Sequence, residues 1–237
     1  MRGFFIAPNF RLPLQPGCDR VAVMARMITA IMATLLLTTI AEAAERATPQ
    51  TCSYEVRVWN VISRQSIDRG VVTHPYDSTG PAEVDPATGC TVCKEDQSEI
   101  RVPPLEPFSV CYKIASRVQA ALEELVRRGA PIFAVTGYHV IKSRGSVNNR
   151  GDRTEFSNHS FGTAIDINPD RNGLYDQCVK FGPECRLLRG GEWRPGVPGT
   201  LERESDVVRA VKAAGFRWGG EIAGKQKDFM HFSPSGY

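Results

Sequence analysis

Apolar residues recur at helical spacing in two stretches of the chain. Between Cys111 and Arg128 they fall three or four residues apart, and Gly129 follows where a helix would end. In the segment "ESDVVRAVKAAG" (204–215), Ser205 or Asp206 occupies the expected N-cap position, and a glycine closes the segment. The pattern predicts a longer core helix in the first stretch and a short helix in the second.

Other segments have the alternation or the composition of β-strands. They are Tyr54–Val61, Pro131–Val140, Ala164–Asn168, Phe216–Glu221 and Phe229–Ser233. Residues 62 to about 108 are rich in proline, aspartate and glycine and are expected to form a loop, as is the connection after Val140. The chain is therefore predicted to be α+β, with helices packed on a central antiparallel sheet.

Composition and the N-terminal segment indicate an exported globular protein. Of the 237 residues, 42% are hydrophobic and 23% charged, which is ordinary for a soluble domain. Residues 27–40 form an uncharged run that follows Arg26 and precedes "AEAAE", as in a secretory signal. The run is shorter than the roughly 20 residues that a membrane span needs. We expect cleavage after Ala43, with an uncleaved anchor as the alternative, and translation that starts at Met24 or Met27.

Cleavage would leave a nearly neutral chain. Residues 1–43 carry four arginines and two acidic residues, so their removal lowers the formal net charge from +3 to +1. The mature chain has no basic footprint of a nucleic-acid binder. We predict a periplasmic or secreted monomer without a stable membrane span. Its parts are a region with one strand and a cysteine-containing loop (44–110) and a core that carries the candidate site (111–237).

The cysteines predict disulfides. Seven are present, and Cys18 lies in the removed segment, which leaves an even number in an exported chain. Cys178 and Cys185 are the preferred local pair, and the other pairings stay open. The spacing Cys90-x-x-Cys93 leaves a structural zinc site or a redox pair as alternatives.

A histidine and an aspartate stand seven residues apart in "SNHSFGTAIDIN" (157–168). On a helix they would be about 10 Å apart, too far to hold one ion. Gly162 lies between them and can supply a turn that brings His159 and Asp166 together. An ordinary hydrogen bond between the two side chains is the alternative to a metal site.

The C-terminal "DFMHFSPSGY" adds a second histidine. Met230 and Phe232 flank His231 at strand spacing, so His231 points away from their apolar side, and Asp228 lies three residues before it. Two histidines and a carboxylate make a catalytic zinc set that leaves a position for water. A further carboxylate beside that set can act as general base.

These residues resemble a known enzyme family. Ser157-x-His159-x-x-Gly162-x-Ala164-x-Asp166, followed by Trp218-Gly219-Gly220 and Asp228-x-x-His231, is similar to the zinc D-alanyl-D-alanine carboxypeptidase and L-alanyl-D-glutamate peptidase family, which includes VanY-like enzymes. The resemblance runs from about Cys111 to Tyr237 and implies a hedgehog/D,D-peptidase-like fold. It implies that zinc is bound by His159, Asp166 and His231, that Asp228 is the catalytic base, and that Ser157 lies in the substrate cleft. Glu221 is the rival for the role of base.

One position departs from the family pattern. The family commonly has Ser-Gly-Tyr-Arg upstream, whose arginine contacts the substrate, and this chain has "TGYHVIKSRG" with His139 in place of the arginine. We place Tyr138, His139 and Arg144 at the substrate, and Lys142 or Arg144 could supply the missing positive charge. Ordinary solvated charges on a loop are the alternative for both.

Resemblance and export together imply peptidoglycan stem peptides as the substrate. The predicted activity is that of a zinc D,D-carboxypeptidase or L,D-endopeptidase. An exported cell-wall binding module that retains the zinc site with little turnover is the alternative, and a disulfide domain without metal is a third. The segment between residues 172 and 199, rich in glycine, proline and cysteine, is interpreted as a disulfide-stapled loop insertion at the rim of the cleft, with a decorative insertion as the alternative.

Overall fold

The computed structural model describes residues 46–236. The predicted N-terminal extension and signal peptide (1–43) lie outside this range. From Thr48 onward the chain forms one compact unit, mixed α+β in content. Within the described range, no helix is long and apolar enough to cross a membrane.

Both predicted α-helices are present. Helix α2 spans Tyr112–Arg127 and buries Ile114, Val118, Leu122 and Leu125 along one face. Helix α3 spans Asp206–Ala213, and the Ser205 side chain caps it by accepting a hydrogen bond from the backbone N–H of Val208. The buried residues of both helices belong to the main hydrophobic core of the unit.

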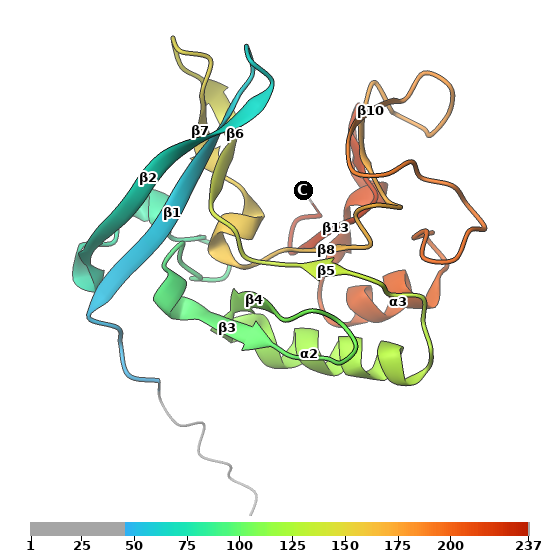
Figure 1. The fold of residues 1–237 in the computed structure, drawn as a ribbon, viewed down its shortest axis with the longest axis horizontal. Coiled ribbons are helices and arrows are strands. Elements are labelled where there is room, and N and C mark those ends of the chain that lie inside the picture. Colours follow the sequence, from blue (N-terminus) through green and yellow to red (C-terminus); the bar gives the residue numbers. More distant parts are fainter. Residues whose placement is uncertain (1–45, 237) are drawn as a thin grey trace, which may run out of the picture. The chain divides into compact units, whose positions relative to one another are not determined.

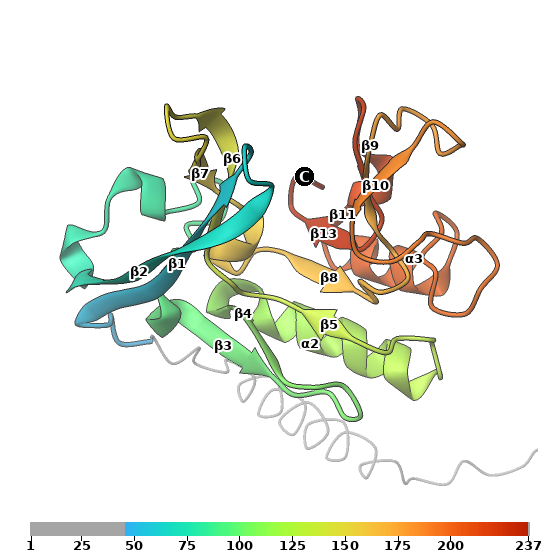
Figure 2. The ribbon, with the colours of Figure 1, turned by 45° about the horizontal axis from the view of Figure 1, so that its top comes forward.

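The strands that carry Asp166 and His231 belong to a small antiparallel sheet. Its order is β11 (Arg217–Trp218), β13 (His231–Ser233), β8 (Ile165–Ile167) and β5 (Val135–Thr136). Helix α2 runs beneath β5 and β4 (Phe108–Cys111) in both views (Figures 1 and 2). Ile165, Ile167 and Phe232 lie in the same core as the helices, with at most 1% of their surface exposed.

A second sheet has the order β2 (Gln65–Pro75), β1 (Thr51–Asn60), β6 (Ile141–Val147) and β7 (Arg153–Phe156). Here the loop predictions were wrong, because β2, β6 and β7 fall in the segments expected to be loops. Strand β2 is mostly exposed and β7 partly so, and they show little of the alternation that marks a half-buried strand. For residues 131–140 the sequence predicted too much strand, because only Val135 and Thr136 pair as a strand.

Two smaller sheets complete the fold. Strands β3 (Gln97–Ile100) and β4 (Phe108–Cys111) pair with each other, and β9 (Leu174–Asp176) lies between β10 (Arg186–Arg189) and β12 (Lys227–Asp228). The predicted insertion at 172–199 is thus ordered around a hairpin. Five short 3-10 helices are η1 (Tyr76–Ser78), η2 (Pro81–Glu83), η3 (Lys94–Asp96), η4 (Asn158–Phe161) and η5 (Gly219–Glu221).

Three disulfides use all six cysteines of the described chain. They are Cys52–Cys93, Cys90–Cys111 and Cys178–Cys185. The expected local pair is confirmed. Cys90 and Cys93 have different partners, so they form neither a redox pair nor half of a zinc site. The first two bridges join β1 and the start of α2 to the loop between η2 and β3.

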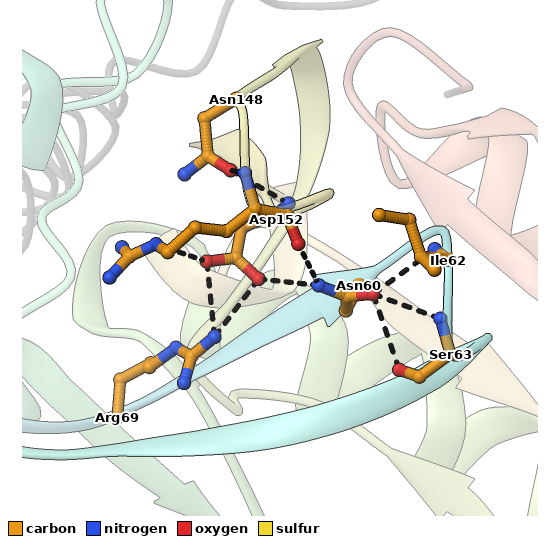
Figure 3. Close-up of polar contacts among 7 residues, drawn as sticks. Asn60, Ile62, Ser63, Arg69, Asn148 and Asp152 are labelled. Atoms are coloured by element: carbon orange, nitrogen blue, oxygen red, sulfur yellow. Dashed lines mark hydrogen bonds and ion pairs between the residues drawn. The ribbon is translucent and has the colours of Figure 1, made fainter.

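A buried aspartate ties the tips of two hairpins in the second sheet together (Figure 3). Asp152, between β6 and β7, accepts hydrogen bonds from Asn60 at 2.9 Å and from Arg69 at 2.9 and 3.0 Å. The hydrogen bond from Asn60 and the positive charge of Arg69 lower the pKa of Asp152. Asn60 also bonds the backbone carbonyl of Arg150 at 2.7 Å. The β1–β2 and β6–β7 hairpins are therefore joined near their tips as well as along β1 and β6.

Candidate metal and catalytic site

His159 is held by a tight turn and a main-chain carbonyl. It lies in η4, which ends at Gly162 with φ of 63°, a left-handed conformation that favours glycine. The ring Nδ1 of His159 lies 2.9 Å from the carbonyl oxygen of Gly137. A carbonyl only accepts, so Nδ1 donates this hydrogen bond, and Nε2 is the nitrogen that faces Asp166 and His231.

Asp166 and His231 face each other across two strands. They are directly paired in the register of β8 and β13, which places their side chains on one face of the sheet. Oδ1 of Asp166 lies 3.1 Å from Nδ1 of His231 and 3.1 Å from Nε2 of His159. The two histidine nitrogens are 3.2 Å apart. Three donor atoms from two distant parts of the chain thus form a nearly equilateral triangle.

The triangle has the dimensions of a metal site. Zinc bound tetrahedrally at ~2.0–2.1 Å would need donor atoms separated by roughly 3.3 Å. His159, Asp166 and His231 are all buried, and their donor atoms lie close enough together to hold one ion. Two imidazole lone pairs and a carboxylate oxygen at these distances repel each other unless a cation or a proton lies between them. The donor set therefore fits a metal ion such as zinc.

The charges of the three residues stabilise an ionised Asp166 beside a histidine whose pKa is raised. Burial alone would raise the pKa of Asp166, but the charge of His159 and hydrogen bonds from both histidines hold it well below its usual range. Burial would lower the pKa of His159, and the charge and hydrogen bond of Asp166 outweigh it. Asp166 is ionised at neutral pH.

Asp228 stands beside this group. It lies at the end of β12, three residues before His231. Its Oδ1 atom is buried and has no hydrogen-bond partner in the described chain. Burial raises the pKa of Asp228 to about 6, although the neighbouring His231 opposes the shift. A carboxyl group with that pKa can both accept and release a proton near neutral pH.

The Trp218-Gly219-Gly220 segment positions Asp228. A Cβ atom on Gly219 would lie 2.3 Å from the backbone oxygen of Asp228, so only glycine permits this approach. The indole N–H of Trp218 donates to the carbonyl of Phe229 at 2.8 Å. These contacts fix the turn that joins Asp228 to His231.

Glu221, the rival base, is engaged elsewhere. Its carboxylate pairs with Lys212 of α3 at 2.7 Å and with Arg203 at 3.2 Å. These ion pairs tie the carboxylate to α3 and to the segment that precedes it. The geometry favours a structural role for Glu221.

The residues predicted to contact the substrate lie at different distances from His159 in the fold. Ser157 is buried directly before η4, and its hydroxyl lies 3.2 Å from that of Ser160. The hydroxyl of Tyr138 donates to the backbone carbonyl of Val92 at 2.7 Å, and the residue packs in the second hydrophobic cluster. The structure therefore brings Ser157 close to His159, whereas the Tyr138 hydroxyl is directed away from the three donor atoms.

His139 stacks on His159. The ring centroids are 4.5 Å apart with the planes inclined by 26°, and Nδ1 of His139 lies 3.1 Å from the same Gly137 carbonyl. Burial, with a smaller contribution from the charge of His159, lowers the pKa of His139 to about 4. His139 is consequently neutral at physiological pH and cannot supply the positive charge of an arginine.

The two basic residues after His139 have contacts of their own. Arg144 donates to Oδ1 of Asn158 at 2.9 Å, next to His159. The ammonium of Lys142 lies 4.9 Å from the centroid of the Phe156 ring. Of the two, Arg144 is the one that contacts a neighbour of His159 in the chain.

Sequence reasoning missed the supports of the site. The Gly137 carbonyl that orients His159 has no side-chain signal by which a pattern could find it. Trp193 stacks on Phe229 with ring centroids 4.1 Å apart, which anchors the 172–199 segment to the turn between Asp228 and His231. A lone tryptophan in an irregular segment gave no reason to expect this contact.

Comparison with known proteins supports the resemblance. Residues 150–234 match the model of a family described as D-alanyl-D-alanine carboxypeptidase. The matched range includes His159, Asp166, Asp228 and His231, and it begins after Tyr138, His139 and Arg144. For this segment the match supports a D,D-peptidase family, and the class of protein that it indicates is a peptidase. No curated protein and no solved structure matches the chain.

Proposed function

We propose that the protein is a zinc-dependent peptidase that hydrolyses the peptide stems of bacterial peptidoglycan, as a D,D-carboxypeptidase or an L,D-endopeptidase. The observation that carries the proposal is the triangle of donor atoms from His159, Asp166 and His231, with sides of 3.1 to 3.2 Å. The family match over 150–234 supports the same conclusion. The segment would then have a hedgehog/D,D-peptidase-like fold.

In this proposal the metal ligands are Nε2 of His159, Oδ1 of Asp166 and Nδ1 of His231. Zinc held in such a site lowers the pKa of water to near 7 and polarises a carbonyl group. Three protein ligands leave a position open for water, as catalytic zinc sites require. The Gly137 carbonyl supports the set, because the hydrogen bond to Nδ1 keeps the His159 ring in the orientation that binding needs.

Asp228 is the proposed proton carrier. Its raised pKa and unpartnered buried Oδ1 suit a group that takes a proton from the attacking water. The same carboxyl group then gives the proton to the leaving amine when the peptide bond breaks. Gly219 and Trp218 hold Asp228 at the position that this transfer requires.

The residues proposed to contact the substrate are chosen by their position around His159. Ser157 and Arg144 both lie next to η4, which carries His159, and are the candidates for polar contacts with a peptide. His139 offers a neutral ring face stacked on His159. Tyr138 would act indirectly by holding its own segment against Val92. Three disulfides agree with a periplasmic or secreted location.

Digestion of purified peptidoglycan followed by mass spectrometry of the fragments tests the proposal. We expect zinc-loaded protein to shorten stem peptides, and protein treated with a chelator to leave them intact. Loss of a terminal D-alanine would identify a carboxypeptidase, and cleavage between L-alanine and D-glutamate an endopeptidase. Unchanged fragments with zinc-loaded protein would overturn the proposal.

The neutral His139 in place of a family arginine motivates the alternative, an exported cell-wall binding module. That module would bind zinc and sediment with purified peptidoglycan without altering its fragments. The digestion assay and a sedimentation assay on the same sample therefore distinguish the two functions.

A further inference from the structure

Arg189, in the segment between residues 172 and 199, lies in the same cross-strand row as Asp228. Leu174 in β9 is paired with Arg189 of β10 on one side and with Asp228 of β12 on the other, and the register of β10 shifts by one residue between Leu187 and Arg189. Directly opposed residues of an antiparallel sheet project from the same face. Arg189 and Asp228 therefore project from one face of this sheet. Their backbones are two strand spacings apart, which is roughly 10 Å across the sheet.

That shared face is the one turned toward the candidate site. The neighbouring row, Tyr175 and Lys227, projects from the opposite face and is buried. The positive charge of Arg189 also acts on Asp228 and His139, where burial is the main cause of the pKa shift and Arg189 a minor one. These two residues flank the metal-binding histidines from separate segments of the chain.

Arg189 is exposed and has no ion pair with any carboxylate of residues 46–236. Arg186, in the same strand, provides the contrast, because its guanidinium binds both carboxylate oxygens of Asp176. A guanidinium without a protein carboxylate is available for an external one, which it can bind through two parallel hydrogen bonds.

We infer that Arg189 binds the free C-terminal carboxylate of the peptide substrate, and so makes the protein select chain ends. The inference rests on the proposed peptidase function. In a carboxypeptidase substrate the terminal carboxylate lies one residue, roughly 3.5 Å of chain, beyond the bond that is cut. A long side chain that starts about two strands from Asp228 and extends over the same face suits that position.

The inference predicts a preference for a bond that is followed, one residue on, by a free carboxylate. An internal bond between residues joined through their α-carboxyl groups offers no carboxylate at this distance, so Arg189 would contribute nothing to binding there. The insertion between residues 172 and 199 thereby acquires a role in specificity through one side chain of its hairpin. Arg144, bonded to Asn158, is the competing cation and enters the test as a separate variant.

The test compares a synthetic stem pentapeptide that ends in a free carboxylate with its C-terminal amide. Binding of both is measured by calorimetry on metal-free protein, and turnover of both on zinc-loaded protein. We expect the unmodified protein to prefer the acid. Arg189→Gln should weaken acid binding and lower kcat/KM for the acid by about 10-fold to 100-fold, mainly through KM, and leave the amide unchanged. Arg186→Gln is the matched control and should retain the preference.

Each outcome separates this inference from the proposed function. Acid-selective binding that disappears in Arg189→Gln without any turnover would support Arg189 and overturn the enzyme. Turnover with equal use of acid and amide would support the enzyme and overturn the role of Arg189. Loss of the preference in Arg144→Gln, with Arg189→Gln unaffected, would also overturn it. Zinc content near one equivalent in every variant shows that the metal site is intact.

Discussion

The Gly137 carbonyl decides which nitrogen of His159 faces the other donors. By accepting from Nδ1 it orients Nε2 toward Asp166 and His231. A single main-chain oxygen thus fixes the orientation of the ring within the group of donor atoms. At this scale the chemistry is set by atoms a few ångströms apart, and the role of each atom can be tested by one substitution.

Asp228→Asn separates a base from a ligand. Asparagine keeps the size and hydrogen bonding of the residue but cannot accept the proton, so zinc should remain near one equivalent per chain. Turnover should fall by about 10²-fold to 10⁴-fold, the usual contribution of a positioned acid-base group. Steady-state kinetics and metal analysis on the same preparation measure both.

Glu221→Gln is the matched control for that substitution. It removes a carboxylate that already pairs with Lys212 and Arg203, so we expect a small effect on turnover. An inactive Glu221→Gln beside an active Asp228→Asn, with zinc in both, would transfer the role of base to Glu221 and leave the metal site unaffected.

The residue types and spacing of His159, Asp166 and His231 were sufficient to predict that they converge. A histidine and an aspartate around a glycine turn, and a histidine between two apolar strand residues, constrain where each side chain points. The Gly137 carbonyl and the approach of Gly219 to Asp228 could not be predicted, because main-chain contacts between distant segments leave no mark on side-chain patterns.

At the scale of elements, burial decided which predictions succeeded. Helix α2 was predictable because its buried residues recur every three or four positions. Strand β2 was not, because its exposed positions have no apolar alternation and its place in the sheet comes from pairing with β1. The β9–β10 hairpin is short and irregular in sequence, and its order depends on the Cys178–Cys185 bridge and on aromatic packing against Phe229.

Replacing both Cys178 and Cys185 by serine tests the hairpin. Closing a loop of this length contributes about 2 kcal/mol through the entropy of the unfolded chain, so the free energy of unfolding should fall by about that amount. Urea denaturation measures it. KM should rise because Arg189 lies on the same hairpin, while zinc content should not change. Loss of zinc in this variant would show that the hairpin supports the metal ligands directly.

At the scale of the whole molecule, each hydrophobic cluster contains a disulfide of its own, and Phe161 packs against both clusters. The second hydrophobic cluster, which includes Cys52, Cys93 and Tyr54, is separate from the main core around α2. The Cys52–Cys93 and Cys90–Cys111 bridges both end in the segment just before η3, so that segment joins the two clusters covalently.

Peptide mapping without reduction tests this arrangement. Protein from an oxidising compartment should contain no free thiol among its mature cysteines and should yield three linked peptide pairs, Cys52–Cys93, Cys90–Cys111 and Cys178–Cys185. A Cys90–Cys93 link or free thiols at both positions would contradict the fold of the N-terminal half.

The central claim is that three converging side chains hold the zinc of a peptidase. The most direct measurement is a titration of metal-free protein with zinc, in which fragments released from purified peptidoglycan are quantified by mass spectrometry at each step. We expect release to rise with added zinc and to level off near one equivalent per chain, and to be absent at every zinc level in His231→Ala. Release that does not depend on zinc, or that His231→Ala retains in full, would contradict the claim.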